Sequence, residues 1–134
     1  MQPTLVPGLT VTRSWTIDRE RTIDFMGEKA RVYATPMLVR DIEVTARDLL
    51  LAHLDPGEDS VGTRVEIDHL AATLMGMKVD VTVTVAAVAG RAVTLDVAAL
   101  VENGNVVPVT VTVDSPMTAA EHVTTLALFN ERGD

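Results

Sequence analysis

"TPMLVRDIEVTARDLLLAHLDPGED", residues 35–59, is the segment of the sequence that decides the fold. Thr35 followed by Pro36 predicts an N-cap and then the residue favoured at the first helical position. Strong helix formers continue as far as Leu54. The sequence "DPGED" at 55–59 is typical of a helix end. We therefore predict a helix at about 36–53.

Period-two alternation replaces the helical pattern after this segment. It predicts strands at 61–70, 77–89, 92–101 and about 105–114, and residues 9–17 alternate in the same way before the helix. Asn103-Gly104 is a strong signal for a hairpin before the last strand. The odd-numbered positions carry the apolar residues, which are Leu9, Val11, Trp15 and Ile17; Val79, Val81, Val83 and Val85; Val93, Leu95, Val97 and Val101; Val107, Val109, Val111 and Val113. An antiparallel sheet with one buried face follows.

The long helix is the element able to cover that apolar face. The order of strand, long helix and then four strands in a meander predicts an α+β hotdog fold, with a curved antiparallel sheet of about five strands wrapped around one central helix. Residues 18–34 are interpreted as a loop or a short helical segment. The tail is predicted as a short helix because "TAAE" at 118–121 fits a capping box, although "HVTTLALF" also suits a strand. All residues, 1–134, form a single domain in this interpretation.

Composition and charge exclude several classes of function. The formal net charge of -8 disfavours binding to nucleic acid or to an anionic membrane. The chain has no cysteine, which excludes disulfides, thiolate metal sites and a cysteine nucleophile. Its histidines and acidic residues follow no metal-binding spacing. No apolar run reaches the roughly 18 residues of a membrane span, and the N-terminus lacks a signal-peptide pattern. We expect a cytoplasmic protein without metal or cofactor.

Glu43 is the first of three residues that do not fit the pattern. It interrupts an apolar stripe of the predicted helix, formed by Val39, Ala46, Leu50 and Leu54. A carboxylate in an apolar stripe loses solvation, which raises its pKa and makes it a candidate base or nucleophile. The alternative is that Glu43 pairs with Arg47 one turn on or with Arg40 one turn back.

His69 is the second. In "VGTRVEIDHLAAT", residues 61–73, it shares the parity of Val65 and Ile67, so its imidazole falls at the end of an apolar row. A lone histidine in such a row is more often a core or interface residue than a catalyst. The small residues that follow distinguish this one, whereas His53 and His122 are expected at the surface.

Thr35 is the third. A threonine N-cap by itself is usually structural. A helix N-terminus, however, presents free N–H groups and a partial positive charge, which suit a developing oxyanion. Because Pro36 has no N–H, the expected donors are those of Met37 or Leu38.

Three segments together resemble the hotdog-fold acyl-CoA thioesterases of the fluoroacetyl-CoA thioesterase type. They are "YATPMLVRDIE" at 33–43, "LDPGEDSVGT" at 54–63 and "VEIDHLAAT" at 65–73 followed by a glycine. The resemblance covers roughly residues 30–104. It implies that Thr35, Glu43 and His69 are catalytic and that Gly62 lies beside the acyl group of the substrate.

The resemblance implies hydrolysis of a small acyl-CoA, or a related acyl thioester, to free acid and thiol. His69 would carry the proton, Glu43 would act as nucleophile or as base for water, and Thr35 would position or relay; whether Glu43 or Thr35 is the attacking group stays open at this point. Substrate contacts are expected from Gly62, Met37, Leu38 and Gly76, with Arg64, Lys78 and Arg91 as candidates for the CoA phosphates. The family also implies a homodimer with the pocket near the interface.

Two other functions remain open at this point. One is a hotdog hydratase or dehydratase that acts on acyl thioesters. The other is a non-catalytic hotdog module that binds an acyl ligand, which the valine-rich last strand favours.

Overall fold

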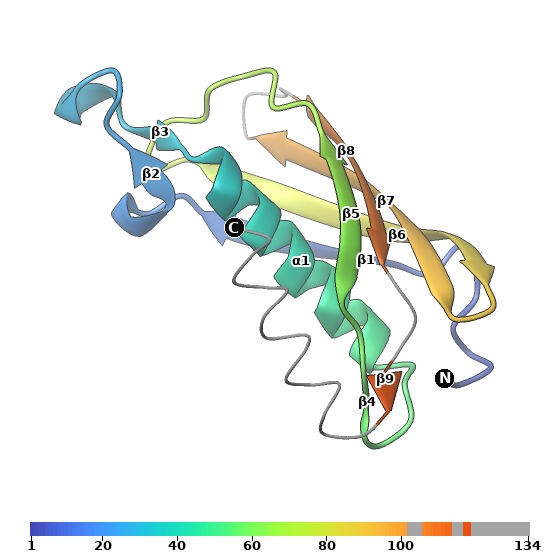
Figure 1. Ribbon diagram of the computed structural model, residues 1–134. Helices are drawn as coiled ribbons and strands as arrows, with labels where there is room; N and C mark the ends of the chain where they lie inside the picture. The colour runs from blue at the N-terminus through green and yellow to red at the C-terminus, as the bar shows by residue number, and fades with distance from the viewer. Residues whose placement is uncertain (102–105, 114–116, 119–134) are drawn as a thin grey trace.

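One long helix packs against a five-stranded antiparallel sheet in the computed structural model, which describes residues 1–101, 106–113 and 117–118 (Figure 1). The helix is α1, Thr35–Leu51. The strands of the sheet are β1 (Thr10–Thr16), β5 (Gly62–Ile67), β6 (Lys78–Ala89), β7 (Ala92–Val101) and β8 (Val106–Val113). The predicted architecture of one helix on a sheet of five strands is confirmed. Within the described ranges, no helix is long and apolar enough to cross a membrane.

The strand order β1-β6-β7-β8-β5 corrects the predicted meander. Strands β6, β7 and β8 do follow one another, but β5 pairs with β8, with Ile67 opposite Val109, and not with β6. The chain therefore crosses between β5 and β6 from one edge of the sheet to the strand next to the other edge, β1, and Figure 1 shows that this connection passes the beginning of α1. Alternation predicts which residues form strands, but it carries no information about which strands become neighbours.

Short elements fill the segment between β1 and α1. They are two 3₁₀ turns, η1 (Arg19–Arg21) and η2 (Glu28–Ala30), and a two-stranded sheet of β2 (Thr22–Ile23) and β3 (Val32–Tyr33). A second small sheet pairs β4 (Glu58–Asp59) with β9 (Met117–Thr118). Thr118, predicted as a helix cap, thus lies in a strand. The rest of the predicted tail helix and the Asn103-Gly104 turn lie outside the described residues.

The start of α1 differs from the prediction. Thr35 is not the N-cap, because Ala34 occupies that position and makes no side-chain capping bond. The carbonyl of Ala34 accepts hydrogen bonds from the N–H groups of Met37 and Leu38, both at 3.0 Å. The backbone therefore satisfies this turn without a capping hydroxyl, and the Thr35 side chain is available for another contact. The helix ends at Leu51 rather than His53.

The core lies between α1 and the sheet, as the alternation predicts. The odd-numbered apolar residues of β6 and β7 are at most 6% exposed; they are Val79, Val81, Val83, Val85, Val93, Leu95, Val97 and Val101. They pack with the buried helix residues Leu38, Ile42, Ala46, Leu49 and Leu50, and with Trp15 and Ile17 at the end of β1. These contacts hold α1 against the sheet. The side chains of the valines predicted on the buried face of β8 lie outside the described part of the structure.

Leu95→Ala should lower the free energy of unfolding by about 2–5 kcal/mol, because it leaves a cavity in the core. Leu95 is 0% exposed, whereas Leu100, on the same strand, is 43% exposed. Leu100→Ala is therefore a matched control and should cost less than about 1 kcal/mol. Urea unfolding of both variants measures the difference, and equal losses would contradict the assignment of the two faces.

Candidate active site

Thr35 and His69 meet at the beginning of α1. Thr35 is the first residue of the helix, and His69 follows the last residue of β5 by two positions. Thr35 Oγ1 and His69 Nδ1 lie 2.8 Å apart in a hydrogen bond. The structure therefore joins two residues that are 34 positions apart in the sequence.

Backbone hydrogen bonds hold the segment that carries His69. The Tyr33 N–H donates to the Thr73 carbonyl at 2.8 Å, and the Met75 N–H donates to the Arg31 carbonyl at 3.1 Å. Gly76 adopts a φ of 95°, a conformation that favours glycine, and its N–H donates to the Ile17 carbonyl at 2.8 Å. These bonds hold the connection between β5 and β6 against β3, directly before the helix start, and against Ile17 at the end of β1. Gly76 thus has a structural role in this turn.

Glu43 lies on α1, eight residues beyond Thr35, and has no ion pair among the described residues. The alternative of pairing with an arginine one turn away is wrong, because Arg47 donates to Asp59 at 2.9 and 2.8 Å and Arg40 lies 3.8 Å from Asp41. Glu43 is half-buried, and its Oε1 is fully buried with no hydrogen-bond partner in the described part of the chain. A buried, unpaired carboxylate oxygen is rare in proteins and requires an explanation.

Burial shifts the protonation equilibria of both ionisable groups. It raises the pKa of Glu43 to about 7 and lowers the pKa of His69 below its ordinary value, since a low-dielectric environment disfavours the charged form of each. Near neutral pH, Glu43 is thus partly ionised and His69 is mainly neutral. His69 Nε2 is, like Glu43 Oε1, buried without a partner in residues 1–101, 106–113 and 117–118. Neither atom uses its hydrogen-bonding capacity within the described part of the chain.

The N–H groups expected to stabilise the oxyanion, those of Met37 and Leu38, are already used in the first helical turn. Both are bonded to Ala34, and the Leu38 side chain is a core residue at 1% exposure. The Ala34 N–H donates to the Arg21 carbonyl at 2.9 Å. Pro36 has no N–H. Among the described residues, the N–H of Thr35 is therefore the donor in this turn that has no acceptor.

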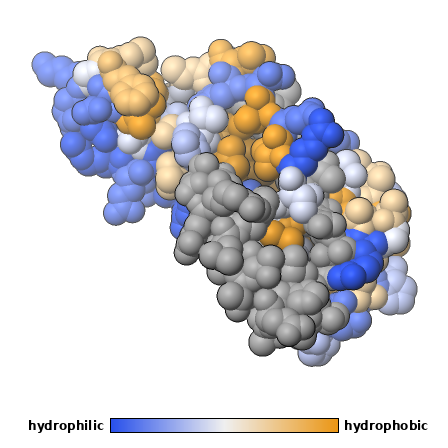
Figure 2. All heavy atoms as spheres, viewed as in Figure 1, coloured by the Kyte–Doolittle hydropathy of each residue, from blue (hydrophilic) through white to orange (hydrophobic). Residues whose placement is uncertain are grey.

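No described hydrogen bond or ion pair links the other residues expected to contact the substrate to Thr35 or His69. Gly62 begins β5 opposite Val113, where the register of the two strands shifts. Arg64 is exposed and pairs with Glu66, and Lys78 is exposed at the first residue of β6. Figure 2 shows a group of hydrophobic residues exposed on the face that is drawn, next to the grey atoms.

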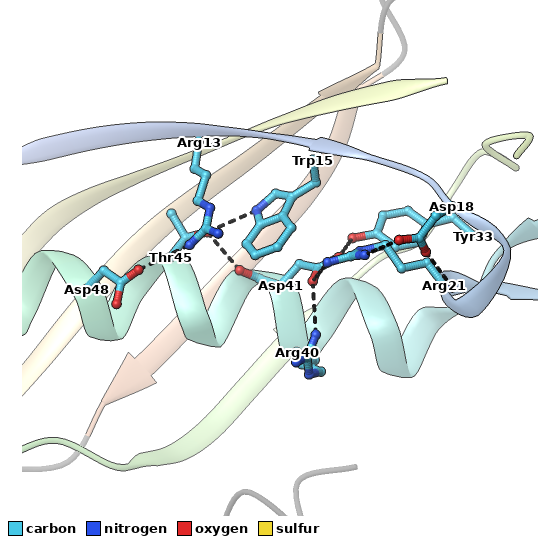
Figure 3. A network of polar contacts seen from close by, with 9 residues as sticks. All are labelled: Arg13, Trp15, Asp18, Arg21, Tyr33, Arg40, Asp41, Thr45 and Asp48. Atoms are coloured by element: carbon cyan, nitrogen blue, oxygen red, sulfur yellow. Dashed lines mark hydrogen bonds and ion pairs between the residues drawn. The ribbon is translucent and has the colours of Figure 1, made fainter. Parts of the chain in front are cut away.

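Asp41 is a residue that sequence reasoning missed. It is 0% exposed, and it accepts hydrogen bonds from Arg21 and from the hydroxyl of Tyr33, as Figure 3 shows. The ring of Tyr33 contacts that of His69. A signal exists in the sequence, because Asp41 shares the buried helix stripe of Leu38, Ile42 and Thr45 at the i, i+3, i+4 and i+7 spacing.

Glu43→Gln should make the protein relatively more stable at high pH. Because the pKa of Glu43 is raised to about 7 in the folded state, its stabilising contribution is full below its ordinary pKa and is lost as the pH rises through about 7. Glutamine does not titrate. The free energy of unfolding of the variant, relative to the parent, should therefore increase by about 1–3 kcal/mol between about pH 5 and about pH 8, after allowance for solvent screening.

Denaturant unfolding at the two pH values measures this difference. The lowered pKa of His69 has the opposite sign, since its contribution is present at high pH and is lost as the pH falls. Both proteins retain His69, so the comparison isolates Glu43. The exposed residue Glu66 provides the control, Glu66→Gln. A relative stability that does not change with pH, or an equal change in this control, would contradict the assignment of Glu43 as a buried carboxyl without a partner in the described residues.

Comparisons with known proteins place this geometry in context. Residues 17–113 match the sequence profile of a family described as fluoroacetyl-CoA-specific thioesterase. A 64-residue stretch is 38% identical to a fluoroacetyl-CoA thioesterase from Streptantibioticus cattleyicolor; it covers 48% of this chain and 46% of that protein, so the chain matches less than half of the relative's length.

Solved structures extend the likeness to nearly the whole chain. A thioesterase superfamily member from Thermus thermophilus has a TM-score of 0.81 and 30% identity, over 98% of this chain and 97% of that one. A mutant fluoroacetyl-CoA-specific thioesterase, solved in complex with fluoroacetate and CoA, has a TM-score of 0.72 and 25% identity, over 87% of this chain and 98% of that one.

Proposed function

The chain belongs to the fluoroacetyl-CoA-specific thioesterase family and has the predicted hotdog fold, and we propose that it hydrolyses a small acyl-CoA, or a related acyl thioester, to free acid and thiol. The family match spans Thr35, Glu43 and His69. The observation that carries the proposal is the 2.8 Å bond between Thr35 and His69, together with two buried atoms, His69 Nε2 and Glu43 Oε1, that have no hydrogen-bond partner in the part of the chain that the structure describes. The relative solved with fluoroacetate and CoA supports the substrate class.

In the proposed reaction, an oxygen nucleophile adds to the thioester carbonyl carbon, the carbon–sulfur bond breaks, and the departing thiolate takes a proton. Glu43 supplies the carboxylate, which either removes a proton from the attacking water or attacks the carbonyl itself, in which case water then hydrolyses the mixed anhydride formed on Glu43 and releases the acid. Its pKa of about 7 suits either role near neutral pH, because an acid and its conjugate base are then both present. His69 carries the proton to sulfur through Nε2.

In this scheme, Thr35 orients His69 and stabilises the carbonyl oxygen of the substrate. Its hydroxyl holds Nδ1, so the opposite nitrogen of the ring is directed to the reaction. Its N–H, which lacks an acceptor among the described residues, donates to the oxyanion that forms on attack. The partial positive charge of the α1 N-terminus adds to this stabilisation.

The remaining substrate contacts of the proposal surround this centre. Gly62 lies beside the acyl group, Gly76 and Met37 line the approach, and Arg64 and Lys78 attract the CoA phosphates. Leu38 contributes packing below the site, where it is buried, and its N–H is not available as a donor.

We also propose that the protein is a homodimer with the pocket near the subunit interface. The sheet ends at β1 on one side and at β5 on the other, and β5 leads directly to His69. An edge strand with unpaired backbone groups favours pairing with another chain. Light scattering after gel filtration should give twice the protomer mass of 14.4 kDa; a monomer at all concentrations would contradict this.

Purified protein and a panel of acyl-CoA thioesters test the function. Acetyl-, fluoroacetyl-, propionyl- and butyryl-CoA should release free thiol, followed with a thiol-reactive dye, and crotonyl-CoA serves as the control for hydration of a double bond. Hydration without thiol release would identify a hydratase instead. Tight binding with no turnover across the panel would identify a binding module, and either result would overturn the proposed hydrolysis.

A further inference from the structure

A buried ion pair lies next to the proposed active site but has no role in the reaction described above. Asp41 Oδ2 accepts a hydrogen bond from Arg21 Nε at 2.8 Å, and Oδ1 accepts one from Arg21 Nη2 at 3.1 Å (Figure 3). The Asp41 side chain is 0% exposed and that of Arg21 is 13% exposed. A buried ion pair is weak evidence for a contribution to stability, because desolvation offsets much of the attraction. Its two-point geometry does, however, hold both side chains in one orientation.

Further contacts restrain Arg21. Its Nη1 donates to Asp18 at 2.8 Å, and its guanidinium lies 4.8 Å from the centre of the Trp15 ring. Trp15 in turn donates from Nε1 to Thr45 Oγ1 at 3.2 Å. The arginine and the carboxylate that it holds are therefore fixed to β1, to the turn after it and to α1.

Tyr33 connects this ion pair to the histidine. Its hydroxyl donates to Asp41 Oδ2, and its side chain is almost completely buried. Burial and the hydrogen bond to Asp41 raise the pKa of Tyr33 well above its ordinary value, so the hydroxyl remains a donor. The ring packs edge-on against the imidazole of His69, with the centroids 6.3 Å apart and the planes at 81°.

We propose that Tyr33, held by Asp41 and Arg21, is a positioning residue for His69. Its ring restricts rotation of the imidazole, so that Nδ1 stays on Thr35 and Nε2 stays directed to the reacting thioester. Tyr33 does not touch the substrate in this proposal, which rests on the proposed function. The hydroxyl fixes the tyrosine ring, and the tyrosine ring fixes the histidine ring.

Tyr33→Phe is the primary test, because it keeps the ring and removes the hydroxyl that orients it. We expect kcat to fall about tenfold with KM changed less than about twofold, since misplaced catalytic groups impair the chemical step more than binding. Thr45→Val is the matched control: Thr45 is 1% exposed and belongs to the same group of contacts, but it does not contact His69. Its kcat should stay within about twofold of the parent value, even if the melting temperature falls.

A second variant and a double mutant separate positioning from general damage to the fold. Arg21→Lys keeps the positive charge and loses the two-point contact, so it should lower kcat in the same direction as Tyr33→Phe. In a His69→Gln background, Tyr33→Phe should not change the residual rate, because it acts through the histidine. An equal loss in both backgrounds would overturn the proposal in favour of a purely structural role.

Nitrogen NMR of histidine-labelled protein tests the positioning without any activity. His69 should give sharp ring signals from one tautomer in the parent and in Thr45→Val. In Tyr33→Phe, its Nδ1 and Nε2 shifts should move toward the average of the two tautomers. Unchanged His69 signals would overturn the proposal, whereas absence of thiol release by the parent protein would overturn the proposed function alone.

Discussion

Replacing Glu43 with glutamine is expected to lower kcat for thioester hydrolysis about a thousandfold or more, because the amide can neither remove a proton from water nor attack the carbonyl. Glutamine keeps the shape and the polarity of the side chain. Its effect on KM should be small, since the carboxylate acts on the reacting carbonyl and not on the CoA group. Initial rates of thiol release at a series of substrate concentrations separate kcat from KM.

The structure offers a direct control for this variant. Glu66→Gln removes a carboxylate from β5 that is exposed and paired with Arg64, and it should retain the parent rate within about twofold. Unfolding cannot explain a loss of activity in Glu43→Gln, because the unpaired buried carboxyl predicts that this variant is at least as stable as the parent above about pH 7. Full activity in Glu43→Gln would end the assignment of Glu43 as a catalytic residue.

His69→Gln is the second variant with a large expected effect. It should lower kcat about a hundredfold to ten-thousandfold, because a positioned general acid–base group contributes that much to a proton transfer. Glutamine can still form a hydrogen bond with Thr35, but it cannot deliver a proton to the departing sulfur. The loss should therefore be larger for substrates with poorer leaving groups than for activated thioesters, and rates on both kinds of substrate measure it.

His53→Gln is the matched control for this variant. His53 lies beyond the end of α1, and its Nδ1 is hydrogen-bonded to Thr4 Oγ1 at 2.8 Å. The variant should keep the parent rate within about twofold. Equal rates in the His69 and His53 variants would show that proton transfer does not depend on His69.

Both variants connect stability with function. The Glu43 carboxyl and the His69 imidazole each bury one polar atom that has no hydrogen-bond partner among the described residues, and such burial costs free energy in the folded state. Proteins accept such costs mainly at functional sites, where the groups must remain available to substrate. The site and the core therefore follow opposite rules: apolar residues pack fully between α1 and the sheet, whereas Glu43 and His69 each keep a buried polar atom without a partner in the described residues.

Local patterns in the sequence are sufficient to predict most of the elements and the exceptions within them. Period-two alternation identified the buried faces of β6 and β7, and the helix formers between Pro36 and the Asp55-Pro56-Gly57 turn located α1 to within two residues. Glu43 and His69 were recognisable because each places an ionisable group in an apolar row. Local spacing is sufficient for these predictions, since backbone geometry alone decides which side chains share a face.

Which groups meet depends on the tertiary structure. It placed β5 beside β8, gave Thr35 a hydrogen bond to His69 in place of a capping bond, and paired Arg47 with Asp59 rather than with Glu43. It also buried Asp41 between Arg21 and Tyr33. A side chain selects its partner from groups that are distant in sequence, by the distances and the desolvation that packing imposes. Periodicity contains no such information, so these contacts follow from the fold.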